Sequence, residues 1–571
     1  MTSILKTQSK SRLVGANAPG IIAPIGHCRI GFQPLPTFAP GHVGIAAKSG
    51  TLSYEAVASV TRAGLGQSLC IGMGGDIVAG TNLVDSLKVF EQDPETEGII
   101  LIGELGGWAE VDAAEWIRDY KKRVKNPKPI AAILGGVHAP AGRIMGHAGA
   151  WTSTGEKTAT EKLKILQDVG VTMVDHPEKF GKVMKTLLSQ SGRDPDKIIQ
   201  DAAQQKRGYH TSTRRPLAET QRKARQTGAH QTRNLILKPN QAPAALKPYL
   251  SPIEGLSVTQ DDAPQTGSSY LSVTIDRTAR QPALATAPTS DPSQLRHRIK
   301  LFPYSYLDGP TPETLRSAVA HAQLDAAPPA ALAQTTALLT SLSRMHTEKE
   351  AITLGGAVSI SSPKEGNGDL LLHAPTIHLQ FDDSAFKSAN RQQDISALRQ
   401  RETEDQDEVE AEADGIVYVR LHPGNPAANI GTLVNGAGLA MNTLDALQLY
   451  GSNNSSNTTT GGLASNFLDT GGKATSATVK KSFELILRDP RVKVIFVNIF
   501  GGLTDGGMIA EGILLAFKEV DMRGVPVVVR IRGTNEEVGQ RIIAESGLGL
   551  EAFDSFGEAS ARVLDIANGS G

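Results

Sequence analysis

The sequence has little cysteine, few aromatic residues and no excess of charge of either sign. Cys28 and Cys70 are the only cysteines among 571 residues, which excludes a disulfide framework or a cysteine-built metal site and predicts a reducing intracellular compartment. Aromatic residues make up 5% of the chain and the formal net charge is -1, so neither stacking platforms for bases nor a basic groove is expected. No apolar run is long enough to cross a bilayer. The sequence therefore predicts neither a nucleic-acid partner nor a membrane partner.

The chain does contain enough apolar residues to bury several cores. Hydrophobic residues make up 40% of the sequence, and a chain of this length is expected to form roughly three to four domains. Apolar runs of strand length alternate with amphipathic helical segments, and these runs lie at residues 98–102, 129–134, 492–497 and 527–531. The alternation predicts α/β domains whose parallel sheets are covered on both faces.

An internal repeat relates two distant parts of the sequence. Residues 93–107 read DPETEGIILIGELGG and residues 489–502 read DPRVKVIFVNIFGG. Upstream of each copy, glycines open an expected helix, at residues 51–63 and 439–450. Two copies of one α/β unit are therefore expected. A glycine-opened helix presents free N–H groups that attract phosphate, and two such helix ends aimed at one point would hold a phosphoryl group.

His147 is the strongest candidate for a reacting side chain. It lies in the stretch APAGRIMGHAGA, residues 139–150, where glycine and alanine leave room for a phosphate and a second substrate. Imidazole accepts a phosphoryl group and passes it on. A single histidine is most often an ordinary loop or core residue. However, Glu104 and the Gly501–Gly502 pair also follow strand ends, which is where ligands of parallel sheets bind.

Taken together, these motifs resemble the succinate–CoA ligase family. Residues 12–190 are similar to the C-terminal part of its α subunit, with NAPGIIAP, GHVGIAAKSGTLSYEAV, GLGQSLCIGMGGD, GIILIGELGG and GRIMGHAGA in the family's order. Residues 268–566 are similar to the second half of its β subunit, with IGTLVNGAGLAMNTLD, SNFLDTGGKAT, VIFVNIFGG and VVVRIRGTNEEVG. ATP-citrate lyases share these modules, but the order of the halves and the lack of a citrate synthase-like domain argue against them. The resemblance implies two flavodoxin-like CoA-ligase domains with a degenerate, partial ATP-grasp-like α+β region between them.

The resemblance also implies a reaction and roles for individual residues. ATP or GTP would phosphorylate His147, the phosphoryl group would pass to a small carboxylic acid such as succinate, and CoA would capture the acyl phosphate. Glu104 resembles the carboxylate that steadies the imidazole, although a solvated turn residue is the alternative. The residues that resemble the phosphate-binding elements are Ser49, Gly50, Thr51, Gly501 and Gly502. Those that resemble the substrate pocket are Tyr54, Asn435, Gly502, Leu503 and Thr504, with a helix cap as the alternative for Asn435.

The sequence departs from the family where magnesium is expected. The family reads Glu-Ile-Asn-Pro where this chain reads GGAV at residues 355–358, and a second family ligand, an aspartate, aligns with His373. Because Mg²⁺ needs hard oxygen ligands, the replacement of both ligands by Ala357 and His373 predicts no metal site. The nucleotide-fold domain that holds CoA in the family is not recognised before Leu13. Residues 505–507, Asp-Gly-Gly, replace Arg-Cys-Asp, and the reversed charge argues against succinate itself.

The motifs divide the chain into five expected segments. These are an α-type CoA-ligase domain at 12–190, a basic linker at 191–267, a partial ATP-grasp-like region at 268–390, a charged connection at 391–415 and a β-type CoA-ligase domain at 416–566. From Arg207 the linker reads RGYHTSTRRPLAETQRKARQTGAHQTRNLILK, with Glu219 as its only acid. This composition is typical of a mitochondrial presequence and equally of a solvated linker. The expected location is therefore mitochondrial, and otherwise cytoplasmic.

Three hypotheses for the function follow from these features. The first is an NDP-forming acid–CoA ligase that acts through a phosphohistidine, with intact ligase subunits supplying nucleotide and CoA binding. The second is a catalytically silent scaffold that binds ligase subunits. An internal presequence-like segment suggests that an α-like gene and a β-like gene have been joined, so the third hypothesis is a mispredicted junction of two adjacent genes.

Overall fold

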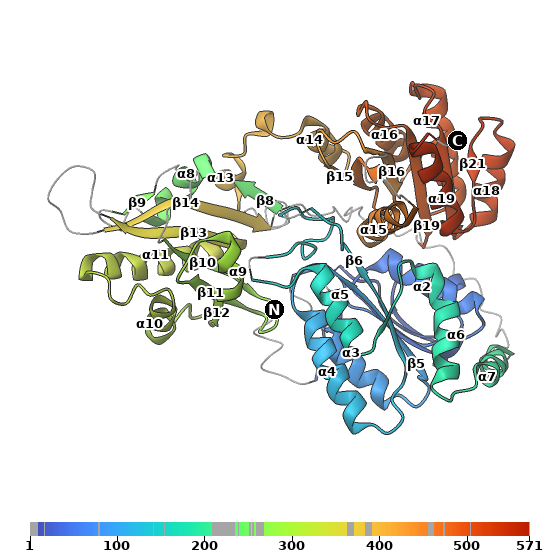
Figure 1. Cartoon of the computed structure of the whole chain (residues 1–571), viewed down its shortest axis with the longest axis horizontal. Helices are drawn as coiled ribbons and strands as arrows, with labels where there is room; N and C mark the ends of the chain where they lie inside the picture. The colour runs from blue at the N-terminus through green and yellow to red at the C-terminus, as the bar shows by residue number, and fades with distance from the viewer. Residues whose placement is uncertain are drawn as a thin grey trace, which may run out of the picture.

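The computed structural model contains three sheets, each built from its own part of the chain (Figure 1). The structure describes residues 10–15, 17–77, 80–140, 142–153, 155–207, 234–237, 239–250, 253, 256–258, 268–361, 371–382, 391–454, 462–471, 474–502 and 504–569. The first and third sheets are mostly parallel, and the middle sheet is mostly antiparallel. The predicted combination of two α/β domains around an α+β region is therefore confirmed.

The first domain is a flavodoxin-like α/β fold. Its parallel strands, counted from β3, have the spatial order 2-1-3-4-5, and β1 and β2 extend one edge in antiparallel fashion. The strands are β1 (Gly20–Ala23), β2 (Cys28–Gly31), β3 (Pro40–Ala47), β4 (Gln67–Gly72), β5 (Gly98–Glu104), β6 (Ile130–Gly135) and β7 (Thr172–Met173). In this order β3 and β5 flank the point where the strand order reverses, so the ends of these two strands define the expected ligand crevice.

Helices cover both faces of this sheet because its central strands are apolar on both sides. Every residue of β5 and β6 is buried. One face carries α3 (Leu83–Gln92), α4 (Ala109–Arg123) and α5 (Ala159–Asp168), and the other carries α2 (Gly50–Arg62) and α6 (Phe180–Gln190). Capping boxes at Asn82 and Thr158 begin α3 and α5 by satisfying N–H groups that no helical carbonyl can reach.

The third domain repeats the fold of the first. Its parallel strands, counted from β16 with the two-residue strand β17 left out, again have the order 2-1-3-4-5. At the edge β15 pairs in antiparallel fashion. The strands are β15 (Val417–Arg420), β16 (Ala428–Val434), β17 (Leu463–Ala464), β18 (Asn466–Asp469), β19 (Val494–Gly501), β20 (Val527–Gly533) and β21 (Glu551–Ala552). The helices are α15 (Ala437–Asn454), α16 (Ser476–Leu487), α17 (Gly506–Glu519), α18 (Glu536–Glu545) and α19 (Phe556–Ala567). The predicted internal repeat is therefore confirmed.

The middle region is a twisted antiparallel sheet with helices packed on it. Its strand order is β12–β11–β10–β13–β14–β8. The strands on this path are β8 (Asn234–Leu237), β10 (Ser269–Asp276), β11 (Gln281–Ala287), β12 (Lys300–Pro303), β13 (Ala351–Ser361) and β14 (Leu371–Asp382). A short strand, β9 (Ser257–Val258), pairs with β14 in parallel. The helices are α8 (Ala242–Leu250), α9 (Pro292–Arg298), α10 (Pro312–His321) and α11 (Pro329–Glu348). The turn between β10 and β11 points toward the first domain, where Arg277 reaches its loops.

Two segments that we expected to be linkers contain ordered structure. In the predicted basic linker, α7 (Pro195–Arg207) buries Ile198 and Ala202 against the first domain, and β8 joins the middle sheet; residues 208–233 lie outside the described part of the chain. The predicted charged connection at 391–415 lies largely at the surface, but it is not without order. That stretch folds into α13 (Gln393–Ser396) and α14 (Gln406–Ala413), because its many acids meet basic partners on neighbouring elements.

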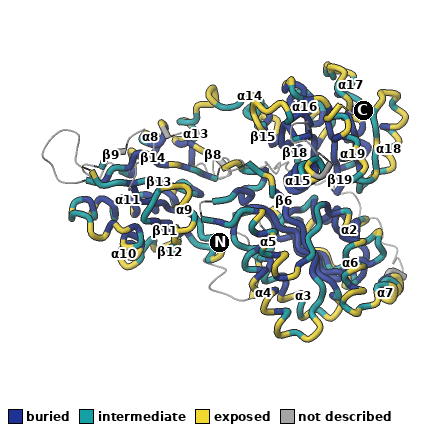
Figure 2. Tube along the Cα trace, viewed as in Figure 1, coloured by how far each residue is buried: buried dark blue, intermediate teal, exposed yellow. Residues whose placement is uncertain are grey.

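The first and third domains share one apolar cluster of buried residues. Buried residues are dark blue in Figure 2 and line the sheets of both domains. Helix α2 packs against α15, and Tyr54 and Leu439 belong to the same buried cluster. Asp445 of α15 accepts hydrogen bonds from the backbone N–H groups of residues 136–138, at distances of 2.7, 3.0 and 2.7 Å. The two repeats therefore pair within one chain. Among the described residues, no helix combines the length and the apolarity needed to cross a bilayer.

Candidate functional site

The two residues expected to carry the chemistry lie in direct contact. Glu104 is the last residue of β5, and its Oε2 lies 2.8 Å from Nδ1 of His147. The side chains are 3% and 14% exposed. Burial disfavours the imidazolium, but the charge and the hydrogen bond of Glu104 outweigh burial, and the pKa of His147 is raised. When Nδ1 carries the proton that Glu104 accepts, Nε2 keeps its lone pair and is the nitrogen available to a phosphoryl group.

Glu104 is held from behind by a buried ionic cluster that the sequence did not reveal. Lys162 is fully buried and donates to the carbonyl oxygens of Glu104 and Gly106 and to Oε2 of Glu110, at 3.3, 2.7 and 2.7 Å. Lys48 pairs with the other oxygen of Glu110 at 2.8 Å. Although burial disfavours its charge, the two lysines lower the pKa of Glu110 to about 2. The cluster fixes the end of β5 and so fixes the carboxylate that contacts the imidazole.

The two glycine-opened helices meet beside the histidine. A Cβ at Gly436 would overlap Oγ1 of Thr51, and a Cβ at Gly438 would overlap Oγ of Ser49, so the start of α15 abuts the start of α2. Gly146, the residue before His147, lies against the start of α15 as well, because a Cβ at Gly146 would overlap the Cβ of Ala437. The structure therefore brings Ser49, Gly50 and Thr51 to the place where the sequence predicts phosphate binding, and that binding role stays a prediction.

Tyr54 and Gly502 also come together across the domain boundary. The ring of Tyr54 lies where a Cβ of Gly502 would be, so only glycine fits at that position. Tyr54 is 4% exposed, and burial raises the pKa of its hydroxyl. Gly501 ends β19, and its carbonyl accepts a hydrogen bond from the Thr534 N–H. The turn after β19 is thereby pressed against α2, as expected for a wall shared by the two domains.

Asn435 is bonded to the end of β19 and to the turn that follows it. It is 2% exposed, and its Nδ2 donates to the Phe500 carbonyl at 2.9 Å and to Oγ1 of Thr504 at 3.3 Å. Its Oδ1 accepts from the Phe500 N–H at 2.9 Å. Both polar groups are engaged within the protein, so Asn435 ties the end of β16 to β19 and shapes the wall. Its role in substrate binding stays a prediction. Leu503 lies outside the described residues.

Sequence reasoning missed a second group of residues around the site. Asp469 ends β18, is fully buried, and accepts from the N–H groups of Gly436 and Gly471 at 2.5 and 2.7 Å. Its charge and that of Asp76 both act on His147. Asp469 follows a strand and precedes a Gly-Gly pair, so the strand-end rule that found Glu104 identifies this position as well. A cavity of about 60 Å³ is lined by Gly75, Asp76, Glu104, Gly149, Arg277 and Arg280, among other residues.

The chain does not fit a magnesium site at the expected place. Ala357 lies on β13 and has no donor atom, and His373 on β14 offers nitrogen where Mg²⁺ prefers oxygen. Within the described ranges, the one group of three potential ligands is Glu55, His176 and Glu178, at the boundary between the first and third domains. The guanidinium of Arg530 already bonds both carboxylates there, so that cluster carries its own cation.

Parts of the chain are similar to two solved ATP citrate lyase structures, with low TM-scores. The ATP citrate lyase of Methanothrix soehngenii, solved with citrate and coenzyme A, is 16% identical, with a TM-score of 0.38 over 57% of this chain and 81% of that chain. A Methanosaeta concilii ATP citrate lyase mutant solved with (3S)-citryl-CoA is 26% identical, with a TM-score of 0.29 over 31% of this chain and 30% of that chain.

Sequence comparisons identify the two repeated domains. A subunit α of ADP-forming succinate–CoA ligase from Staphylococcus epidermidis is 45% identical over 183 residues, which are 32% of this chain and 59% of that protein. The mitochondrial subunit α-2 of the same ligase from Trichomonas vaginalis is 47% identical over 182 residues, which are 32% of this chain and 58% of that protein. The chain thus spans about three fifths of the length of these relatives. The CoA-ligase family model matches residues 47–172 and 433–564, so the chain carries two regions of the CoA-ligase family, and its resemblance to the succinate–CoA ligases is confirmed.

Proposed function

We propose that this protein is an NDP-forming acid–CoA ligase that works through a phosphohistidine at His147. In this reaction Nε2 of His147 attacks the γ-phosphorus of ATP or GTP, and the bond to the leaving NDP breaks. A carboxylate oxygen of the acid then takes the phosphoryl group and forms an acyl phosphate. The thiolate of CoA attacks the acyl carbon, and inorganic phosphate leaves with the bonding electrons.

The observation that carries the proposal is the contact of 2.8 Å between His147 and Glu104 beside two helix starts. The carboxylate fixes the imidazole, favours the proton on Nδ1 and stabilises the positive ring that forms when Nε2 carries phosphate. A phosphoryl group placed there also meets the positive ends of two helix dipoles.

The acid substrate is proposed to be a small carboxylate bound against Tyr54 and the turn at Gly501–Gly502. Asp505 stands where the family has an arginine, and its negative charge would repel a carboxylate substrate. The repulsion is weakened because Asp505 caps α17, where its carboxylate accepts a hydrogen bond from the Met508 N–H at 3.1 Å. That hydrogen bond, together with Asn535, lowers the pKa of Asp505, so the carboxylate stays ionised. A negative charge there favours an acid that carries fewer charges than succinate.

Nucleotide and CoA binding are proposed to come in part from intact ligase subunits. The positions of the expected metal ligands hold Ala357 and His373, so the chain itself does not offer the oxygen donors that Mg²⁺ requires beside a nucleotide. A complementing β subunit would deliver the phosphoryl group to His147. The curated relatives are themselves subunits, in keeping with an assembly of this kind.

Transfer of labelled phosphate tests the proposal directly. Purified protein is incubated with γ-labelled ATP or GTP, alone and with intact ligase subunits, next to His147→Ala. Acid-labile label that disappears in the variant and is discharged by a carboxylic acid plus CoA supports the ligase. Absence of label in every mixture contradicts it and favours the scaffold, for which the loss of the metal ligands at Ala357 and His373 is the specific support. Binding of ligase subunits without label would identify that second function.

Two further proposals concern the origin and location of the chain. The shared core of α2 and α15 supports a genuine single chain that joins an α-like and a β-like part. A transcript read across codons 190–235 tests this, since two separate transcripts would contradict it. We also propose a mitochondrial location, on the basis of the basic segment after Arg207. Imaging of the tagged full-length protein against a mitochondrial marker tests it.

A further inference from the structure

The histidine loop, described at residues 139–140 and 142–151, is contacted by side chains from the middle region and from α14. The loop is bonded internally, because the Ala150 N–H donates to the His147 carbonyl at 2.9 Å. The Gly149 N–H donates to the Gly75 carbonyl at 3.1 Å. A displacement of Gly149 is therefore passed on to the imidazole two residues earlier.

Arg277, in the turn between β10 and β11, holds the second half of this loop. Its Nη1 donates to the Gly149 carbonyl at 3.0 Å, and its guanidinium lies 5.1 Å from the ring centre of Trp151. Its Nε pairs with Glu156 at 3.3 Å, and the side chain is 11% exposed. Gly107 leaves the space that the arginine fills, since a Cβ there would lie 3.1 Å from Cδ of Arg277. One side chain thus contacts three points that follow His147.

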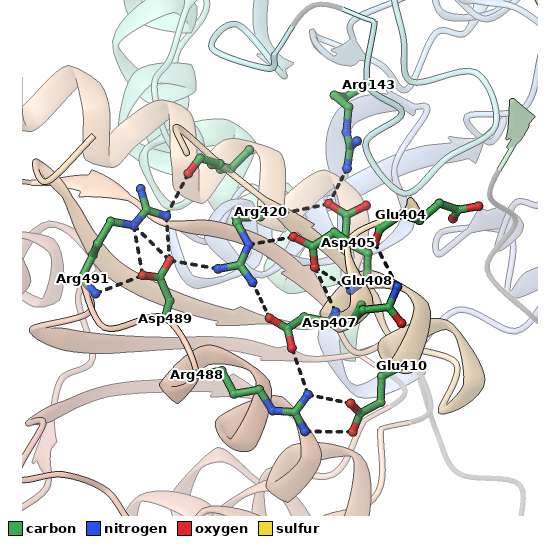
Figure 3. A network of polar contacts seen from close by, with 12 residues as sticks. Arg143, Glu404, Asp405, Asp407, Glu408, Glu410, Arg420, Arg488, Asp489 and Arg491 are labelled. Carbon is green, nitrogen blue, oxygen red and sulfur yellow. Dashed lines mark hydrogen bonds and ion pairs between the residues drawn. The ribbon is translucent and has the colours of Figure 1, made fainter. Parts of the chain in front are cut away.

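Glu408, on α14, holds the first half of the loop (Figure 3). Its Oε1 accepts from Nη2 of Arg143 at 2.5 Å and from the Arg420 N–H at 3.1 Å. Arg143 is 45% exposed, and an isolated pair of this kind contributes little. Here, however, the carboxylate is already fixed, because Asp405 caps α14 and also binds Arg420 at 2.8 Å. A fixed acceptor costs less conformational entropy when the arginine binds.

We propose that Arg277 of the middle region and Glu408 of α14 together act as a clamp that positions the histidine loop, so that both are positioning residues. This inference rests on the proposed role of His147. It assigns to these two side chains the task of keeping the imidazole aligned with Glu104 and the two helix starts. Misplacement of a reacting group by about 1 Å can cost about a hundredfold in rate, so such a clamp affects phosphoryl transfer without touching the substrate.

Hydrogen exchange and phosphate labelling of the full-length protein test the clamp together. Arg277→Met should raise amide exchange in residues 139–151 by about tenfold, since one charge-assisted hydrogen bond is lost. It should lower the rate of His147 labelling by a similar factor while the affinity for nucleotide stays unchanged. Arg277→Lys should restore little of the exchange protection or of the labelling rate, because one ammonium group cannot bond Gly149 and Glu156 as the forked guanidinium does. The matched control is Arg193→Met, which removes an equally buried arginine, 11% exposed, bonded to Glu97 and backbone carbonyls away from the loop.

The pair at the other end of the loop is tested by a double-mutant cycle. Glu408→Gln and Arg143→Met should each raise loop exchange about threefold, and the double variant should add nothing further, because both break one contact. Glu551→Gln, which breaks a surface pair with Arg562, should leave the loop unchanged. Loop exchange in the Arg277 and Glu408 variants equal to that of the controls would overturn the clamp. If wild-type protein takes up no label in any mixture, the proposed function fails, whereas the exchange comparison still decides the clamp.

Discussion

Replacing Glu104 by glutamine should lower the pKa of His147, because the carboxylate that favours the imidazolium is lost. The two side chains lie 2.8 Å apart and are nearly excluded from water. A hydrogen bond to a charged group of this kind contributes about 1.5–3 kcal/mol, and 1.36 kcal/mol corresponds to one pKa unit. Burial, which disfavours the imidazolium, is then opposed only by the smaller effects of the Asp469 and Asp76 charges. The titration midpoint of His147 should therefore fall from its raised position above the ordinary value of 6.5.

The assay is an NMR titration of protein labelled at the histidine Cε1 carbons. The chain has 13 histidines, and the spectrum of His147→Gln identifies the signal that belongs to position 147. Stability provides a second reading. Because the folded-state pKa is raised, the stabilising contribution of His147 is complete below pH 6.5 and is lost as the pH rises through the folded value. Glu104→Gln should remove this dependence of the unfolding free energy on pH. An unchanged midpoint in the variant would refute the claim that Glu104 sets the protonation of the imidazole.

Three other changes have defined outcomes. Gly75→Ala should abolish phosphate labelling with little effect on unfolding, because the added Cβ would overlap the imidazole of His147; retained labelling would contradict this geometry. Arg530→Met should cost about 3–5 kcal/mol in urea unfolding, since it leaves buried carboxylates unpaired, and adding Glu55→Met should recover part of the loss. The pKa of Glu110 is lowered to about 2, so its contribution is present above about pH 4.5 and is lost as the pH falls toward 2. Glu110→Gln should flatten that acid dependence in thermal unfolding scans.

Most of the fold could be predicted because its central strands are buried on both faces. Such strands appear as continuous apolar runs, so the expected strands at 129–134 and 527–531 correspond to β6 and β20 within two residues at either end. The repeat then predicted the second domain from the first. His147 and Glu104 could be found for the same reason, since they follow strands of one sheet and the carboxyl ends of parallel strands meet at one edge.

The residues that were missed make their contacts with partners that are distant in the sequence. Arg277 contacts Gly149 across 128 residues, and no periodicity in either segment records that contact. The order within the charged stretch at 391–415 was missed because composition cannot distinguish acids that face water from acids that face arginines. Asp407, for example, bonds Arg420 and Arg488, which come from two other elements of the third domain. Only the tertiary arrangement turns such a charged segment into an ordered element.

The same reasoning explains why the site depends on the register between the two repeats. Glu55 and Glu178 belong to the first domain, whereas Arg530, which is 1% exposed, belongs to the third. A buried ion pair adds little net stability, yet it strongly disfavours any arrangement that leaves one charge alone, so it selects a single docking geometry. That geometry is the one in which Thr51 adjoins Gly436 and the two helix starts flank His147. Joining the two domains in one chain makes this docking intramolecular. The fraction of molecules with docked domains then depends on the length of the connecting chain and not on protein concentration.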